Sequence, residues 1–101
     1  MGNEDLRKMN LTQRMSEKLS SMSKGQKKIV NYITMHYSKA VFMTAAKLGK
    51  EVGVSESTVV RFATLLGYKG YPEFQKALEG MKQLNESDML ILLSVINRML
   101  T

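Results

Sequence analysis

Apolar residues recur at helical spacing along most of the chain, and short polar stretches separate the helices that this spacing predicts. No convincing alternation of apolar and polar residues precedes residue 85, so no strand is expected there. We therefore expect an all-α fold, a small bundle of about five to six helices. The predicted helices cover approximately residues 11–19, 24–36, 45–52, 56–66 and 72–84.

Residues that typically begin and end helices support these boundaries. Ser23 followed by Gln26 predicts a capping box, in which each side chain accepts a hydrogen bond from the backbone N–H of the other residue. Thr44 and Ser55 are typical N-caps, and Pro72 fits the first turn of a helix because its missing N–H costs nothing there. Gly53 and Gly67 are the predicted helix ends.

Residues 37–43 read as a connector between the second and third helices. Two of its apolar residues, Val41 and Phe42, are expected to fill the core. A tight turn over residues 68–71 is expected before the fifth helix. Apolar residues at helical spacing predict the buried stripe of that helix: Phe74, Ala77, Leu78, Met81 and Leu84.

The last part of the chain has a different composition. Residues 89–100 are nearly all apolar, but the stretch is too short and too interrupted to span a bilayer. We expect a flexible segment over residues 1–9, one domain over 10–85 and an apolar helical tail over 86–101. The tail either packs on its own domain, forms a dimer contact or leads to a further domain, and a strand over 90–96 is a lesser alternative.

Composition excludes several classes of function. With 101 residues the chain can bury one modest core, and the lack of cysteine excludes disulfides and thiolate metal sites. His36 is the one histidine, and the acidic residues are scattered rather than paired. We therefore expect neither a metal site nor a cofactor nor an enzyme, and His36 reads as a surface residue at a helix end. A polar N-terminus without a signal-peptide pattern favours the cytoplasm and no membrane.

The positive charge is concentrated in the middle of the chain. The formal net charge is +6, and eight basic residues against two acidic ones lie between Lys24 and Lys69. A basic central segment is typical of a protein that binds a phosphate backbone, although a solvated lysine-rich surface would give the same count. The basic residues are Lys24, Lys27, Lys28, Lys39, Lys47, Lys50, Arg61 and Lys69.

Residues 45–64 carry the spacing of a helix-turn-helix, in which two short helices cross at a steep angle. Gly49 stands where the helices approach closely, and Gly53 stands where the turn needs a positive φ. Val54 is expected to pin the turn to the core. Apolar residues that are expected to face inward are Leu48, Val52, Val59 and Phe62.

The remaining residues of the second helix are expected to point outward, and this outward set indicates double-stranded DNA as the partner. The candidate DNA-contacting residues are Thr44, Lys47, Ser55, Glu56, Ser57, Thr58, Val60, Arg61, Thr64, Tyr68 and Lys69, with Lys50 as a further phosphate contact. The short hydroxyls at the helix start suit a phosphate, because free N–H groups and the helix dipole favour an anion there.

The remaining contacts have specific chemistry. Arg61 can form a bidentate contact with guanine O6 and N7, or it can bind a phosphate. Val60 is suited to a thymine methyl group, and Glu56 either accepts from a cytosine amine or repels phosphates. The cations and the Tyr68 hydroxyl that flank the helix are expected to bind phosphates.

The stretch Gly53-Val-Ser-Glu-Ser-Thr-Val-Val-Arg-Phe62, followed by Leu66-Gly-Tyr-Lys-Gly-Tyr-Pro-Glu-Phe74, resembles the N-terminal domain of the RpiR family of bacterial transcription regulators. The resemblance extends back through residues 23–33 and covers roughly residues 10–84. It implies a helical DNA-binding domain that acts as a dimer, usually followed by a sugar-isomerase-like domain that senses phosphosugars; we expect no such domain within these 101 residues. Gly49 replaces the alanine that is more usual in the family.

A protein-interaction module is the main alternative. Nine methionines and the apolar tail would suit an adaptable contact surface, although methionine is more often core filler. Salt separates the two readings: binding to DNA weakens steeply as salt rises, because each phosphate contact releases counterions. An apolar protein contact would change little with salt.

Overall fold

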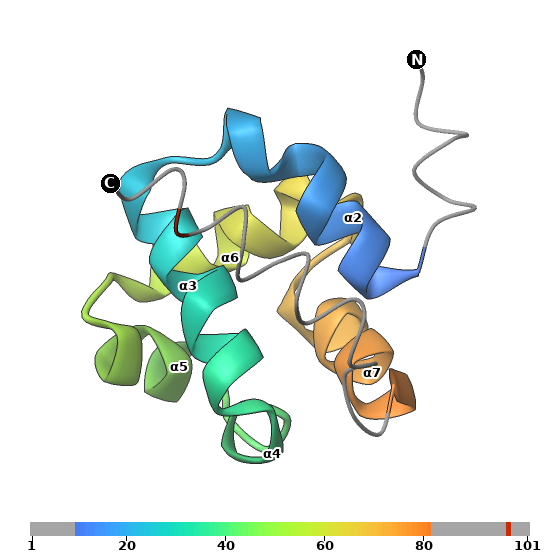
Figure 1. Cartoon of the computed structure of the whole chain (residues 1–101). Coiled ribbons are helices and arrows are strands. Elements are labelled where there is room, and N and C mark those ends of the chain that lie inside the picture. Colours follow the sequence, from blue (N-terminus) through green and yellow to red (C-terminus); the bar gives the residue numbers. More distant parts are fainter. Residues whose placement is uncertain (1–9, 82–96, 98–101) are drawn as a thin grey trace.

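The computed structural model describes residues 10–81 and 97, and within these residues the fold is all-α (Figure 1). Six α-helices and one 3-10 helix surround a common core. They are α2 (Leu11–Lys18), η1 (Leu19–Ser21), α3 (Lys24–Met35), α4 (Tyr37–Ala40), α5 (Ala45–Val52), α6 (Glu56–Leu65) and α7 (Tyr71–Met81). The predicted fold class is confirmed. The predictions for residues 1–9 and for the apolar tail, Asn97 apart, lie outside the described residues.

The predicted first helix is present, and its capping box was missed. Asn10 accepts a hydrogen bond from the Gln13 N–H at 2.8 Å, and the Gln13 side chain accepts from the Asn10 N–H at 3.0 Å. Leu11, Met15 and Leu19 are all buried, as their spacing predicted. Leu19 belongs to η1, because the helix tightens into a 3-10 turn at its end.

The capping box that begins α3 is confirmed. The Ser23 hydroxyl accepts from the Gln26 N–H at 3.2 Å, and the Gln26 side chain accepts from the Ser23 N–H at 2.9 Å. Ile29, Val30 and Ile33 are completely buried and form the inner face of the helix. Burying a side chain of this size contributes about 1.5–3 kcal/mol, so this face holds α3 on the core.

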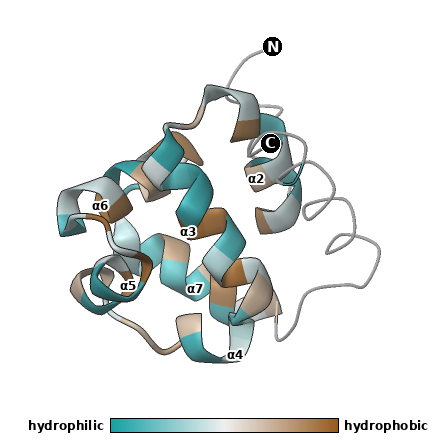
Figure 2. Cartoon of the chain, turned by 60° about the vertical axis from the view of Figure 1, so that its left-hand side comes forward, coloured by the Kyte–Doolittle hydropathy of each residue, from teal (hydrophilic) through white to brown (hydrophobic). Residues whose placement is uncertain are grey.

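The core joins α6 to α7 through aromatic rings. Phe62 and Phe74 are fully buried and meet edge to face with their centroids 5.6 Å apart. Tyr71 packs on the same Phe74 ring at 5.6 Å. In Figure 2 the helices show both hydrophilic (teal) and hydrophobic (brown) residues, as amphipathic helices around one core do.

Residues 37–43 differ from the prediction. They contain a one-turn helix, α4, rather than a plain connector, and Phe42 is not part of the core. Ala40 and Val41 are buried, whereas the Phe42 side chain is 83% exposed. Phe42 lies in the turn after α4, so the packing of α4 and its attachment to α7 decide that Val41 rather than Phe42 turns toward the core.

Side chains of α7 hold the carbonyl groups of this segment. The Tyr71 hydroxyl donates to the Met43 carbonyl at 2.6 Å, and the Gln75 amide donates to the carbonyls of Val41 at 3.2 Å and Met43 at 3.0 Å. The Tyr37 hydroxyl donates to the Leu78 carbonyl of α7. These bonds fix the entry into α5, because Met43 immediately precedes its N-cap.

The helix α7 begins one residue before the predicted Pro72. Its Tyr71 was expected in a turn, but it is the first helical residue and is buried. Phe74 and Leu78 are fully buried, Ala77 and Met81 are half-buried, and Leu84 lies outside the described residues.

Candidate nucleic-acid interface

The turn between α5 and α6 has the predicted conformation. Gly53 adopts φ +89° and ψ +33°, a left-handed conformation that residues with a Cβ rarely adopt. The N–H groups of Gly53 and Val54 both donate to the Gly49 carbonyl at 2.8 Å. This pair of bonds closes α5 and sets the direction in which α6 begins.

Gly49 lies at the closest approach between α5 and the turn. A Cβ at this position would lie 2.8 Å from the Val54 carbonyl oxygen and 3.3 Å from the carbonyl group of Ser55. These neighbours are backbone atoms, so they cannot rotate out of the way. The predicted close approach is confirmed, and in this chain an alanine, the residue that the resemblance implies as more usual, would require the backbone of the turn to shift.

The inward face of the unit is nearly as predicted. Leu48, Val59 and Phe62 are fully buried, while Val52 and Val54 are half-buried and pack on the edge of the core. Buried Ala63 and Leu66 complete the inner face of α6. This apolar contact holds α6 against α5 and leaves its opposite face free of the core.

That opposite face is exposed. Ser57, Arg61 and Thr64 follow one another at helical spacing, so they lie on one side of α6, and all three are exposed. Ser55 and Glu56 at the start of the helix are exposed too, and Val60 is 36% exposed. The structure therefore presents six of the predicted residues on one accessible helix surface.

Three hydroxyl groups cluster at the start of α6. The Ser55 side chain accepts from the Thr58 N–H at 3.1 Å, as an N-cap does. Its Oγ also lies 3.0 Å from Ser57 Oγ and 2.9 Å from Thr58 Oγ1. Thr58 is only half-exposed, so Ser55 and Ser57 are the more accessible hydroxyls. The cluster stands where the helix dipole favours an anion.

The start of α5 supplies a second set of predicted contacts. Thr44 caps the helix by accepting from the Lys47 N–H at 3.1 Å. The Lys47 ammonium forms an exposed ion pair with Glu51 at 3.1 Å, one helical turn away. Such exposed pairs contribute little free energy, so Lys47 can exchange Glu51 for a phosphate at small cost. Lys50 is exposed on the same helix.

Tyr68 at the far end of α6 is more constrained than its prediction as a phosphate contact implies. Its ring is half-buried, with the Arg14 guanidinium 4.5 Å from the centroid and the Phe74 ring 6.0 Å away. Burial raises the pKa of the Tyr68 hydroxyl, and the nearby Arg14 lowers it in part. The hydroxyl thus remains a hydrogen-bond donor at neutral pH. Lys69 beside it is exposed.

Two residues that position α6 were missed by the sequence reasoning. Arg14 donates to the Leu66 carbonyl at 3.0 Å and so places a cation at the C-terminal end of α6, which the helix dipole favours. A Cβ on Gly25 would lie 3.1 Å from Val54 Cγ1, so α3 begins against the turn. Gly25 stands in the first turn of a helix, and this position could have indicated a close contact. Nothing in the sequence around Arg14 indicated its bond to Leu66.

The described residues contain no group of three or more histidine, cysteine or acidic side chains that could hold a metal ion. His36 is exposed at the end of α3 and its ring lies 4.8 Å from Tyr32, so its prediction as a helix-end surface residue is confirmed. Among the helices in residues 10–81, none combines the length and the apolar character that crossing a bilayer requires.

Comparison with known proteins agrees with this geometry. Residues 9–88 match the model of a protein family described as "Helix-turn-helix domain, rpiR family". The chain is 36% identical over 70 residues to an uncharacterized HTH-type transcriptional regulator, YfhH, of Escherichia coli (strain K12). That match covers 69% of this chain and 25% of the relative, so the chain spans about a quarter of the relative's length. No solved structure was found to match. The chain belongs to the rpiR family of helix-turn-helix domains.

Proposed function

We propose that this domain binds double-stranded DNA with α6 in the major groove and serves as the DNA-reading part of a transcription regulator. The observation that carries the proposal is the exposed face of α6, where Ser57, Arg61 and Thr64 lie together. An α-helix fits the major groove, and residues on its outer face then reach base edges. Family membership and the regulator to which the chain is similar support the same function.

The proposed contacts divide into phosphate contacts and base contacts. The DNA backbone is bound at the start of α5 by its N-cap Thr44 and along α5 by Lys47 and Lys50. The hydroxyls at the start of α6 and the side chains of Tyr68 and Lys69 after it bind further phosphates. Arg61 contacts a guanine edge, which would contribute about 1–3 kcal/mol of discrimination. Val60 lies against a thymine methyl group and Glu56 accepts from a cytosine amine. The hydrogen-bonded Ser55 cluster supports this division, because it holds several hydroxyls at one helix end.

The regulatory setting is inferred from the family resemblance. We propose that the protein is a cytoplasmic homodimer and that it regulates sugar metabolism. This domain would bind DNA without catalytic activity of its own. A phosphosugar effector would bind to a domain outside this chain. The relative is about four times as long as the matched segment, which supports additional domains in proteins of this kind.

Protein binding is the second candidate function. It is favoured by two exposed apolar side chains, Phe42 at 83% and Met35 at 58%. The apolar tail, on which the sequence-based alternative depends, lies outside the described residues. Salt dependence separates the candidates, because only contacts with phosphates release condensed counterions.

Selection of bound fragments from a genomic DNA pool tests the proposal. We expect a shared sequence motif among the recovered fragments, with two-fold symmetry if the domain acts as a dimer. Recovery of fragments without any shared motif, or of none above a no-protein control, would reject sequence-specific binding.

A further inference from the structure

The segment that links α2 to α3 runs along one side of α6. At one end Arg14 of α2 bonds to the Leu66 carbonyl at the end of α6. At the other end Gly25 of α3 lies against Thr58 in the first turn of α6, with 3.6 Å between its Cβ position and Thr58 Cγ2. Thr58 and Leu66 are separated by roughly 12 Å of helix, at about 1.5 Å per residue. The chain between Arg14 and Gly25, which includes the later part of α2, η1 and the link to α3, therefore runs along α6 in the opposite direction.

This segment and α5 lie on different sides of α6. In Figure 1 the chain passes from α2 to α3 above α6, whereas α5 lies below it, and Figure 2 shows the same vertical order. A helix in the major groove has a phosphate ridge on each side, since the groove is only about 12 Å wide. The phosphate contacts that the sequence predicts at α5, namely Thr44, Lys47 and Lys50, would bind one of these ridges. With α6 in the groove, the linking segment would lie on the side of the other ridge, because it is on the side of α6 away from α5.

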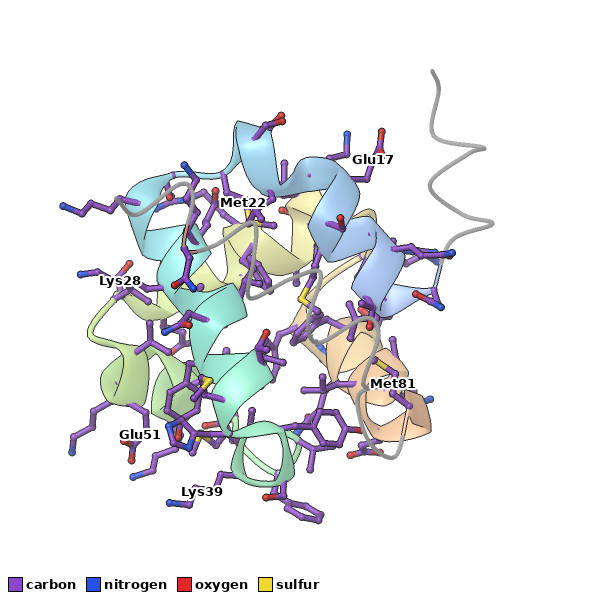
Figure 3. All side chains as sticks on the ribbon, viewed as in Figure 1. Glu17, Met22, Lys28, Lys39, Glu51 and Met81 are labelled. Carbon is purple, nitrogen blue, oxygen red and sulfur yellow. The ribbon has the colours of Figure 1, made fainter. Side chains whose placement is uncertain are left out.

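The exposed residues of this segment are suited to phosphates. Met22 turns inward and is buried, as Figure 3 shows, while Ser20, Ser21, Ser23 and Lys24 are exposed. No acidic residue occurs between Lys18 and Lys50, so no carboxylate of this stretch opposes an approaching phosphate. Lys24 directly precedes Gly25, so its Cα lies about 3.8 Å from the Cα of the residue that contacts Thr58 of α6.

We propose that residues 20–24 form a second phosphate-contacting surface, in which the Lys24 ammonium binds the DNA backbone on the side of α6 away from α5. The inference rests on the proposed function, because it assumes that α6 occupies the groove. Lys28, one turn further along α3, is less suited to this role because it lines a hollow that it shares with Glu51.

Salt dependence of binding tests the inference. The full chain, Lys24→Gln and a control, Lys76→Gln, are titrated with a random-sequence duplex at several salt concentrations. Lys76 is an exposed lysine of α7, and α7 packs through Phe74 on the later half of α6. Both variants lose one charge, so their net charges match. Circular dichroism and thermal melting confirm that both are folded.

We expect Lys24→Gln to reduce the slope of log K against log salt by about 1, the value for one phosphate contact. Lys76→Gln should keep the slope of the unmodified chain, and Lys24→Arg should restore it. A slope for Lys24→Gln equal to that of Lys76→Gln would overturn the inference and leave the proposed function intact. Absence of salt-dependent binding by the unmodified chain would overturn both.

Discussion

Gly49 of α5 and Val54 of the turn approach so closely that a methyl group on Gly49 would lie 2.8 Å from the Val54 carbonyl oxygen. The same Gly49 carbonyl accepts hydrogen bonds from the N–H groups of Gly53 and Val54. One residue thus determines both the spacing and the closure of the helix-turn-helix. The direction of α6, and with it the exposed face proposed to read DNA, depends on this contact.

Gly49→Ala is expected to destabilise the domain by about 1–3 kcal/mol, because the added Cβ must displace backbone rather than a flexible side chain. Alanine is otherwise the better helix former by up to about 1 kcal/mol, so the clash must outweigh that gain. Gly80→Ala is the matched control, since a Cβ there would have no neighbour within 4 Å in the described structure. It should stabilise α7. Denaturant unfolding measures both, and equal gains would contradict the close contact.

Alkaline pH is expected to destabilise the fold through Tyr71. Burial raises the pKa of its hydroxyl from 10.0 to about 12. The folded state therefore keeps this proton while the unfolded state loses it. The contribution of the protonated Tyr71 hydroxyl to the free energy of unfolding is complete below about pH 10. It is lost as the pH rises toward 12, and the loss amounts to about 1–3 kcal/mol. The free energy of unfolding, measured across this pH range, should fall less steeply for Tyr71→Phe than for the unmodified chain. An equally steep fall in both would show that other groups cause the loss of stability.

The Thr12 hydroxyl is a stabilisation target. It is buried and has no hydrogen-bond partner within the described part of the chain. Thr12→Val removes the unpaired hydroxyl and keeps the shape, so we expect a gain of about 1 kcal/mol in the free energy of unfolding. Thr34 is the control, because its equally buried hydroxyl donates to the Val30 carbonyl at 2.8 Å. Thr34→Val should gain less or lose stability, and the reverse order would show that Thr12 finds a partner.

Arg61→Ala is expected to remove sequence discrimination. Affinity for the selected site should fall by about 1–3 kcal/mol more than affinity for a random duplex, because the bidentate contact to guanine is lost. Arg61→Lys keeps the charge but not the planar fork, so it should restore backbone binding without the discrimination. Fluorescence anisotropy on both duplexes measures this. Equal losses on the two duplexes would make Arg61 a phosphate contact.

Local patterns predicted the helix-turn-helix well, because its chemistry is local. The caps at Ser23, Thr44 and Ser55 each satisfy a backbone N–H three residues away, so the sequence alone contains both partners. The positive φ of Gly53 is likewise a property of one residue in its turn. The exposure of α6 follows from the apolar positions on its other face.

Features that join distant parts of the chain were missed. Arg14 and Leu66 are 52 positions apart, and Tyr71 and Met43 are 28 apart, so no local pattern pairs them. Phe42 was misplaced for a related reason. Val41 and Phe42 are equally suited to a core by composition, and which one turns inward depends on the one-turn helix α4 and its attachment to α7.

The account rests on the exposed face of α6 contacting DNA, and an NMR titration tests this most directly. The ¹⁵N-labelled chain is titrated with a duplex recovered by the genomic selection, and amide shifts are followed residue by residue. We predict that the largest changes occur over residues 55–64 and at Thr44, and that they diminish as salt rises. Large changes around Met35 and Phe42 with α6 unaffected would contradict the account.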